Sequence, residues 1–132
     1  MDRKKIIIDT SAYSAFIMGN ANIKRSLDKS DEIFINPIIL GELLNGFIMG
    51  KYENKNRNIL NDFLASPRVD ILNIDGDTSE RYAAILKFLY EKGMPIPTND
   101  IWIAATAMQF GLKVLTLDKH FLKLPQILIE FF

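Results

Sequence analysis

The chain has 132 residues, of which 48% are apolar and 11% aromatic, a composition that predicts one folded domain over residues 1–132 and excludes a disordered chain. It contains no cysteine, which excludes thiol catalysis, disulfide bonds and thiolate metal sites. Sixteen basic and sixteen acidic residues give a net charge of zero, so bulk charge does not indicate a nucleic-acid-binding protein.

The N-terminal segment places three isoleucines after a charged start. Residues 1–5 have the charge of a signal peptide, but the apolar stretch that follows is too short and Asp9 ends it. No segment approaches the roughly 18 apolar residues that a membrane helix needs. We therefore expect a soluble, cytoplasmic protein without a membrane partner. Lys4–Ile8 is instead the first predicted strand, because a β-branched run is typical of a buried strand in a parallel sheet.

Helical segments and strands alternate along the rest of the chain. Ser11–Met18 is a predicted helix, with Thr10 or Ser11 as its cap and Gly19 as its stop. The other predicted helices are Asn22–Lys29, Pro37–Phe47, Lys51–Leu64, Ser79–Glu91 and Asp100–Phe110, the last of them capped by Asn99. The other predicted strands are Ile33–Ile35, Val69–Ile74, Lys113–Leu117 and Ile127–Phe131. This alternation predicts an α/β domain with a parallel sheet and right-handed crossovers.

Four acidic residues stand out by their positions. Asp9 and Asp118 each follow a predicted strand, and ligands of parallel sheets bind outside the carboxyl ends of the strands. Asp100 lies in the first turn of a helix, and Glu42 interrupts an apolar helical face, where an acid is rarely buried unpaired. Taken singly, Asp9 could cap a helix, Asp100 could interact favourably with the dipole at the start of its helix, and Asp118 could start a turn. A shared cation explains all four residues at once.

The ligand types narrow the choice of metal. Carboxylate oxygens suit Mg²⁺ or Mn²⁺, and without a histidine or cysteine cluster zinc is a poor choice. Carboxylates with such a metal indicate phosphoryl chemistry, in which the metal polarises phosphate and activates water.

Four motifs, in chain order, carry a resemblance to a known family. They are Ile8-Asp9-Thr10-Ser11, the helix segment Ile38 to Glu42, the alanine-rich stretch from Asn99 to Ala107, and the stretch from Val114 to Phe121. With these motifs the chain resembles the PIN domain family, and within it the small ribonuclease toxins of VapBC toxin–antitoxin pairs.

The resemblance implies a fold, an activity and partners. The fold would be a three-layer α/β/α sandwich with a central, mainly parallel sheet. The activity would be that of a Mg²⁺- or Mn²⁺-dependent endoribonuclease that cleaves single-stranded or structured RNA. The partners would be a small antitoxin protein and a second copy of the chain in a homodimer. The apolar stripes of residues 37–47 and 79–89 also favour a homodimer, unless they fill the core of the monomer.

The resemblance also implies roles for individual residues. The metal-binding and catalytic acids would be Asp9, Glu42, Asp100 and Asp118. The supporting polar neighbours would be Thr10, Ser11, Asn99 and Thr116. His120, two residues after Asp118, is expected to be a surface histidine, with a substrate contact as the alternative.

Three other functions compete with this interpretation. A haloacid-dehalogenase-like phosphatase needs a second aspartate two residues after the first, and Ser11 occupies that position. A receiver-like phosphoacceptor domain would use Asp9, but its acidic pair and late lysine are not evident. A non-catalytic PIN-like module that binds RNA or a partner stays open, although the presence of all four acids argues against it.

Overall fold

A five-stranded parallel sheet forms the centre of the molecule in the computed structural model, which describes residues 3–132. The strand order is β3-β2-β1-β4-β5, and each neighbouring pair is parallel. The strands are β1 (Lys5–Ile8), β2 (Glu32–Ile35), β3 (Val69–Ile71), β4 (Lys113–Thr116) and β5 (Leu128–Phe131). The predicted α/β class with a parallel sheet is confirmed.

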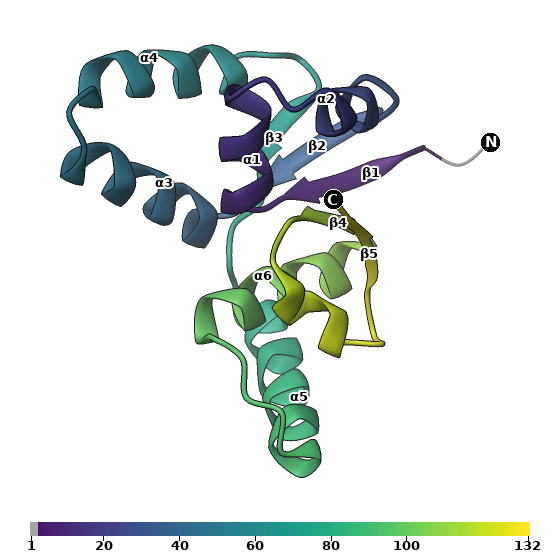
Figure 1. The fold of residues 1–132 in the computed structure, drawn as a ribbon. Coiled ribbons are helices and arrows are strands. Elements are labelled where there is room, and N and C mark those ends of the chain that lie inside the picture. The colour runs from purple at the N-terminus through teal and green to yellow at the C-terminus, as the bar shows by residue number, and fades with distance from the viewer. Residues whose placement is uncertain (1–2) are drawn as a thin grey trace.

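Helices cover both faces of this sheet. They are α1 (Thr10–Ile17), α2 (Ala21–Asp28), α3 (Pro37–Met49), α4 (Glu53–Leu64), α5 (Gly76–Lys92), α6 (Thr98–Phe110) and the short 3-10 helix η1 (Lys119–Lys123). Figure 1 shows α1 to α4 on one side of the sheet, and α5, α6 and η1 on the other. Right-handed crossovers produce this division, because the chain moves one way across the sheet from β1 to β3 and the other way from β3 to β5. The three-layer arrangement is as expected.

The core lies around β1 and β4, the two strands whose apolar runs are continuous. Ile7, Ile8, Val114 and Leu115 are completely buried, because helices cover both faces of the sheet at these strands. The alanine-rich part of α6 is buried as well, and its small side chains let the helix lie close to the sheet. None of the helices in residues 3–132 is long and apolar enough to cross a membrane.

Several predicted boundaries are wrong for local reasons. Asp9, not Thr10 or Ser11, caps α1, since its side chain accepts a hydrogen bond from the backbone N–H of Ala12 at 2.8 Å. Asn99 does not cap α6, which begins at Thr98 after Pro97. Four further differences concern length or an unexpected element: α4 begins later than predicted, at Glu53; β3 ends at Ile71; α5 begins at Gly76; and η1 was not predicted.

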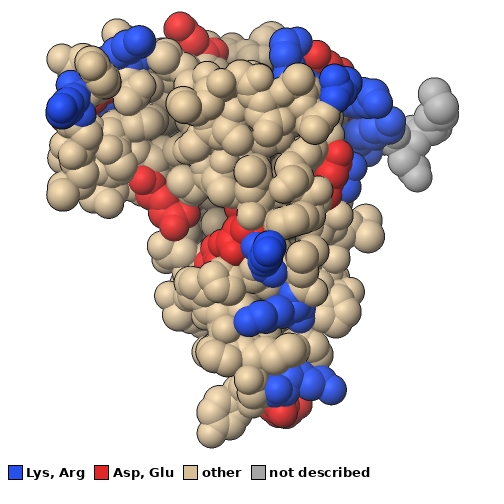
Figure 2. Space-filling model, viewed as in Figure 1, with Lys and Arg blue, Asp and Glu red and all other residues tan. Residues whose placement is uncertain are grey.

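The order of the strands defines one special point at the sheet edge. The direction of chain movement reverses between β1 and β4, and such switch points are where open α/β sheets bind ligands. Asp9 directly follows β1, and Asp118 lies two residues after the end of β4. Figure 2 shows acidic side chains gathered in the middle of this face, where α3, α6 and η1 come together, with basic side chains on the rim.

Candidate metal centre

Asp9 is the most firmly held of the four acids. It is 3% exposed, and its Oδ1 accepts hydrogen bonds from the Ser11 hydroxyl at 2.7 Å and the Ala12 backbone N–H at 2.8 Å. Its Oδ2 accepts one from the Thr116 hydroxyl at 2.5 Å. Each carboxylate oxygen has two lone pairs, so Oδ2 keeps one acceptor direction for a further partner. Asp9 therefore caps α1 and is still able to bind a ligand.

Ser11 and Thr116 tie the two strand ends together. Each hydroxyl donates to Asp9 and accepts a backbone N–H from the segment after β4: Leu117 donates to Ser11 at 3.0 Å, and Asp118 donates to Thr116 at 2.8 Å. Thr116 is completely buried. These four hydrogen bonds fix the position of Asp118 relative to Asp9.

Glu42 reaches the same place from α3. Its Oε1 accepts a hydrogen bond from the Thr10 hydroxyl at 2.7 Å, and its Oε2 accepts one from the Asn99 side-chain amide at 3.3 Å. The two donors come from α1 and α6, so Glu42 is held between elements on opposite sides of the sheet. The polar neighbours expected from the sequence thus all contact an acid: Ser11 and Thr116 contact Asp9, and Thr10 and Asn99 contact Glu42.

A completely buried asparagine links α3 to α6, and no motif in the sequence singled it out. Asn36 caps α3 by accepting from the backbone N–H of Ile39 at 3.0 Å, and its amide donates to the Thr106 hydroxyl at 2.9 Å. Thr106 in turn donates to the Trp102 carbonyl at 3.0 Å. Since α3 carries Glu42 and α6 carries Asp100, this buried linkage fixes the two acids relative to each other.

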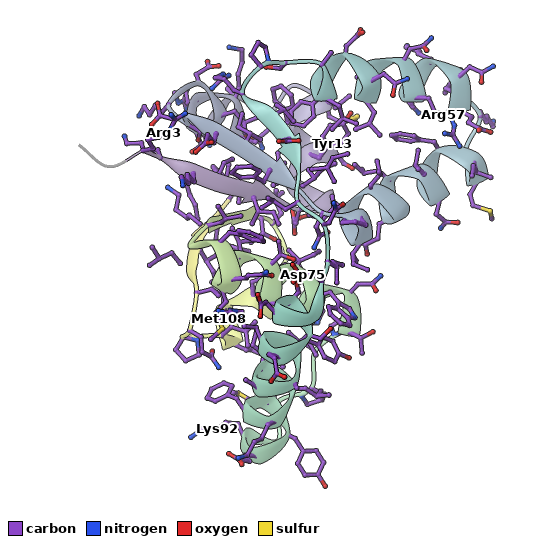
Figure 3. All side chains as sticks on the ribbon, turned by 180° about the vertical axis from the view of Figure 1, so that it is seen from behind. Arg3, Tyr13, Arg57, Asp75, Lys92 and Met108 are labelled. Atoms are coloured by element: carbon purple, nitrogen blue, oxygen red, sulfur yellow. The ribbon has the colours of Figure 1, made fainter. Side chains whose placement is uncertain are left out.

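The other end of α6 is fixed against the start of α5. Asp75 caps α5 and lies at the end of that helix near the sheet, far from Lys92 at its tip (Figure 3). Its Oδ1 accepts from the Thr78 backbone N–H and from the Gln109 side-chain amide, each at 3.1 Å. Both contacts stabilise the charged carboxylate and hold the pKa of Asp75 below its usual range. The contact with Gln109 connects the two helices at this end.

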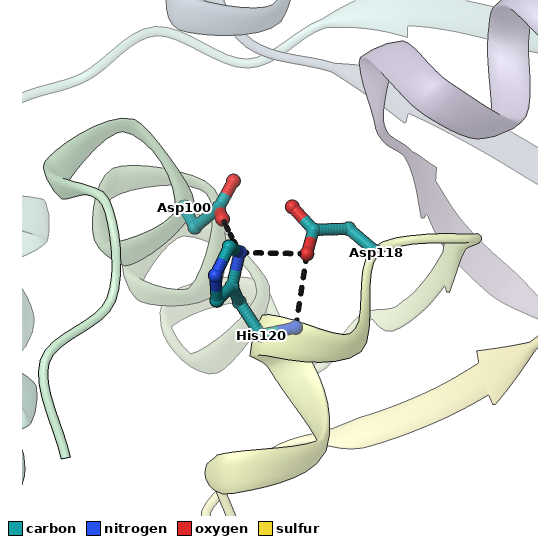
Figure 4. Close-up of side chains that lie close together, drawn as sticks. All are labelled: Asp100, Asp118 and His120. Carbon is teal, nitrogen blue, oxygen red and sulfur yellow. Dashed lines mark hydrogen bonds and ion pairs between the residues drawn. The ribbon is translucent and has the colours of Figure 1, made fainter.

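Asp100, Asp118 and His120 form the tightest group of the site. Nδ1 of His120 lies 2.8 Å from Oδ1 of Asp118 and 3.3 Å from Oδ2 of Asp100 (Figure 4). These are ion-pair distances, but the directions do not suit a hydrogen bond. Nδ1 of His120 and Oδ2 of Asp100 are therefore buried without a hydrogen-bond partner among residues 3–132. The expectation that His120 would be a surface residue is wrong for its Nδ1 atom, although the side chain as a whole is 44% exposed.

The pKa values of two acids of the site are raised, in part by the charges of the neighbouring acids. The pKa of Asp100 is raised to about 8. Burial is the largest cause, followed by a side-chain hydrogen bond with Asp118 and by the charges of Asp118, Asp9 and Glu42. Burial, with a smaller contribution from the Asp118 charge, also raises the pKa of Asp9. Carboxylates that repel one another in this way are stabilised in their charged form by a cation. Hard oxygen donors, one of them buried without a partner, fit a divalent metal ion.

Comparisons with known proteins find relatives along almost the whole chain. The sequence profile of the PIN domain family matches residues 6–127. A ribonuclease VapC of Rickettsia bellii is 34% identical over 125 residues, covering 92% of each chain. A ribonuclease VapC1 of Rickettsia felis is 35% identical over 115 residues, covering 86% of this chain and 84% of that protein. Among solved structures, the DNA-bound VapBC of Salmonella typhimurium is similar with a TM-score of 0.86 at 26% identity, covering 96% of this chain and 97% of that one.

Proposed function

The chain belongs to the PIN domain family and, within it, to the VapC ribonucleases, and on this basis we propose that it is a Mg²⁺- or Mn²⁺-dependent endoribonuclease. Its substrate is single-stranded or structured RNA, and its biological role is that of the toxin in a toxin–antitoxin pair. The relatives named ribonuclease support the activity.

One observation carries the proposal: Asp9, Glu42, Asp100 and Asp118 come from four separate elements or turns at the β1–β4 switch point, and the charges of the other three contribute to raising the pKa of Asp100. These four acids are the proposed metal-binding and catalytic residues. When bound there, a divalent cation supplies a Lewis acid that polarises a phosphate and makes water a better nucleophile.

The polar neighbours have a positioning role in this proposal. The hydroxyl groups of Thr10, Ser11 and Thr116 and the amide of Asn99 each occupy one acceptor direction of a carboxylate. Such contacts orient the remaining lone pairs, which in metal sites tunes affinity by about 10- to 100-fold. We assign these four residues to orienting Asp9 and Glu42.

The proposed partners are a small antitoxin protein and a second copy of the chain. The antitoxin is supported by similar structures that are VapBC complexes, such as the one from Salmonella typhimurium. The homodimer is supported by large apolar side chains that stay exposed on α3 and α5, the helices whose apolar stripes first suggested it. They are Ile48, Met49, Leu86 and Tyr90. Light scattering of the purified chain at high micromolar concentration should give twice the monomer mass, and a monomer mass would contradict the homodimer.

The experiment that tests the function compares RNA cleavage with RNA binding. Wild-type protein should cleave single-stranded RNA in Mn²⁺, and Asp9→Asn should lose cleavage and metal binding while keeping most of its RNA binding. Asp62→Asn changes an exposed acid on α4 and serves as the matched control. If the wild type binds RNA but does not cut it in either metal, the non-catalytic PIN-like module becomes the better description.

A further inference from the structure

We propose that His120 supplies a nitrogen ligand to the metal ion, so that the site prefers Mn²⁺ over Mg²⁺. This inference rests on the proposed metal dependence and deepens it, because it names a ligand that carboxylates alone do not provide. It also gives a role to the one histidine of the chain.

The first argument is geometric. Asp100, Asp118 and His120 each offer one ligand atom, and these atoms all lie within 4.8 Å of one another. Two ligands of one metal ion are separated by such distances. Figure 4 shows the imidazole ring facing both carboxylates, with Nδ1 as its nearest atom. The atom that points into the cluster is therefore a possible donor to the same ion.

The second argument concerns unsatisfied polar atoms. Nδ1 of His120 and Oδ2 of Asp100 are buried, 3.3 Å apart, and neither has a hydrogen-bond partner among residues 3–132. A buried polar atom without a partner destabilises the fold, so two such atoms that face each other indicate a partner that both share. Asp100 is only 8% exposed, which leaves little room for solvent to play that part. A cation that accepts lone pairs from both atoms would satisfy them together.

The third argument is that the local fold holds the imidazole in place. The backbone N–H of His120 donates to Oδ1 of Asp118 at 2.9 Å, which caps η1. The next residue, Phe121, is completely buried and anchors the turn in the core. The backbone of His120 is thus fixed on both sides, and its side chain reaches the cluster from a rigid element, as a metal ligand should.

The types of ligand atom then decide which of the two metal ions the site prefers. Mg²⁺ favours oxygen ligands and an octahedral shell with several waters. Imidazole nitrogen suits later transition metals, and Mn²⁺ accepts mixed nitrogen and oxygen ligands more readily than Mg²⁺ does. Two carboxylates and one imidazole should therefore shift the balance towards Mn²⁺.

The test measures metal binding rather than cleavage. Calorimetric titration of the wild type with Mn²⁺ and with Mg²⁺ gives the ratio of the two affinities. His120→Ala should weaken Mn²⁺ binding by at least about tenfold and Mg²⁺ binding by less. His120→Asp restores an oxygen ligand and should move the ratio towards Mg²⁺, whereas Lys123→Ala, on the same 3-10 helix, should leave it unchanged.

A spectroscopic measurement separates a ligand from a neighbour. Pulsed electron paramagnetic resonance of Mn²⁺ bound to the wild type should show coupling to an imidazole nitrogen, and this coupling should vanish in His120→Ala. A wild type that binds Mn²⁺ without nitrogen coupling, and with the same affinity ratio as His120→Ala, would overturn the role of His120 while leaving the proposed function intact. If the wild type binds neither ion, the metal dependence and the role of His120 both fail.

Discussion

The hydroxyl group of Thr116 donates to Oδ2 of Asp9 at 2.5 Å and so joins the ends of β1 and β4 beside the acidic cluster. The same hydroxyl accepts the backbone N–H of Asp118 at 2.8 Å, and thereby connects two of the proposed metal ligands. A hydroxyl group is the smallest side-chain group that donates and accepts at once. A buried threonine at the end of β4 is thus part of the site as well as of the core.

We predict that Thr116→Val lowers both stability and metal affinity. Valine keeps the shape of the side chain but leaves a buried carboxylate oxygen and the backbone N–H of Asp118 without their partner, a loss of about 1–3 kcal/mol. Chemical denaturation and calorimetric titration with Mn²⁺ measure the two effects. Thr116→Ser keeps the hydroxyl and should retain metal affinity. A valine variant with wild-type metal affinity would show that the hydroxyl does not position the site.

We predict that Asp100→Asn stabilises the metal-free protein at neutral and alkaline pH. The pKa of Asp100 is raised to about 8, so the folded state holds this proton more tightly than the unfolded state does. The resulting contribution to stability is fully present below the pKa of the unfolded chain and is lost as pH rises through about 8. Asparagine carries no charge, so the free energy of unfolding of the variant should exceed that of the wild type by about 1 kcal/mol at pH values at which the wild-type carboxylate ionises.

Thermal unfolding in EDTA between about pH 5 and about pH 9 tests this prediction. The melting temperature of the wild type should fall more steeply with pH than that of the variant. Saturating Mn²⁺ should reverse the order, since it stabilises only a protein that binds it. A metal-free variant that melts below the wild type at every pH would mean that Asp100 serves mainly as a group at the start of α6.

The sequence was sufficient to predict the parallel sheet, and the four acids that it singled out lie near one another, while their metal-binding role stays a prediction. The isoleucines of β1 form a continuous run because helices bury both faces of the strand, and this pattern is visible in sequence. The capping residue of α1 could not be identified from the sequence, because Asp9, Thr10 and Ser11 are all residue types that cap helices well. Capping propensity does not distinguish between three such neighbours. Tertiary contacts decide the matter: Thr10 is drawn to Glu42, and Ser11 to the backbone of Leu117.

The positions of Asn99 and His120 also depend on tertiary contacts with residues far away in the chain. Asn99 is a plausible cap by type, but its amide donates to Glu42, which is 57 residues away in the chain. The position of His120 two residues after Asp118 was compatible with a turn contact, and that contact exists. Its approach to Asp100 arises from the packing of η1 beside α6, and no local pattern in the sequence reports it.

We predict that Tyr13→Phe increases stability by about 1 kcal/mol, the lower end of the cost of an unpaired buried polar group. Tyr13 lies in the interior between the sheet and α4 (Figure 3), with its ring edge against Phe63 at 5.3 Å between centroids. Its hydroxyl is buried without a hydrogen-bond partner among residues 3–132, and burial raises its pKa to about 12. Phenylalanine keeps the ring contact and removes the hydroxyl.

Denaturant unfolding measures this change, with Tyr52→Phe as the control. Tyr52 is 66% exposed, so loss of its hydroxyl should leave the free energy of unfolding unchanged. A clear loss of stability in Tyr13→Phe alone would refute the prediction and would imply that the Tyr13 hydroxyl has a partner in solution.

The last prediction concerns the ends of the cleaved RNA, which distinguish two kinds of ribonuclease chemistry. Enzymes that work without metal activate the ribose 2′-hydroxyl with a general base and leave a cyclic phosphate. This chain has one histidine, His120, and its Nδ1 faces two carboxylates. A cluster of acids suits the other chemistry, in which water attacks phosphorus directly and the 3′-oxygen departs.

We therefore expect products with a 5′-phosphate and a 3′-hydroxyl, because the 3′-oxygen departs and the phosphate stays on the 5′-oxygen of the downstream fragment. End mapping of a single-stranded RNA after incubation with Mn²⁺ would identify the ends. Activity should disappear in EDTA, since the acids then have no cation to hold. At saturating Mg²⁺, which the carboxylates of His120→Ala should still bind, this variant should retain most of the activity, because no step needs the imidazole as a general base. Cyclic 2′,3′-phosphate ends, or full cleavage in EDTA, would overturn this chemistry even though the PIN fold stands, since other groups at the β1–β4 edge would then have to activate the ribose.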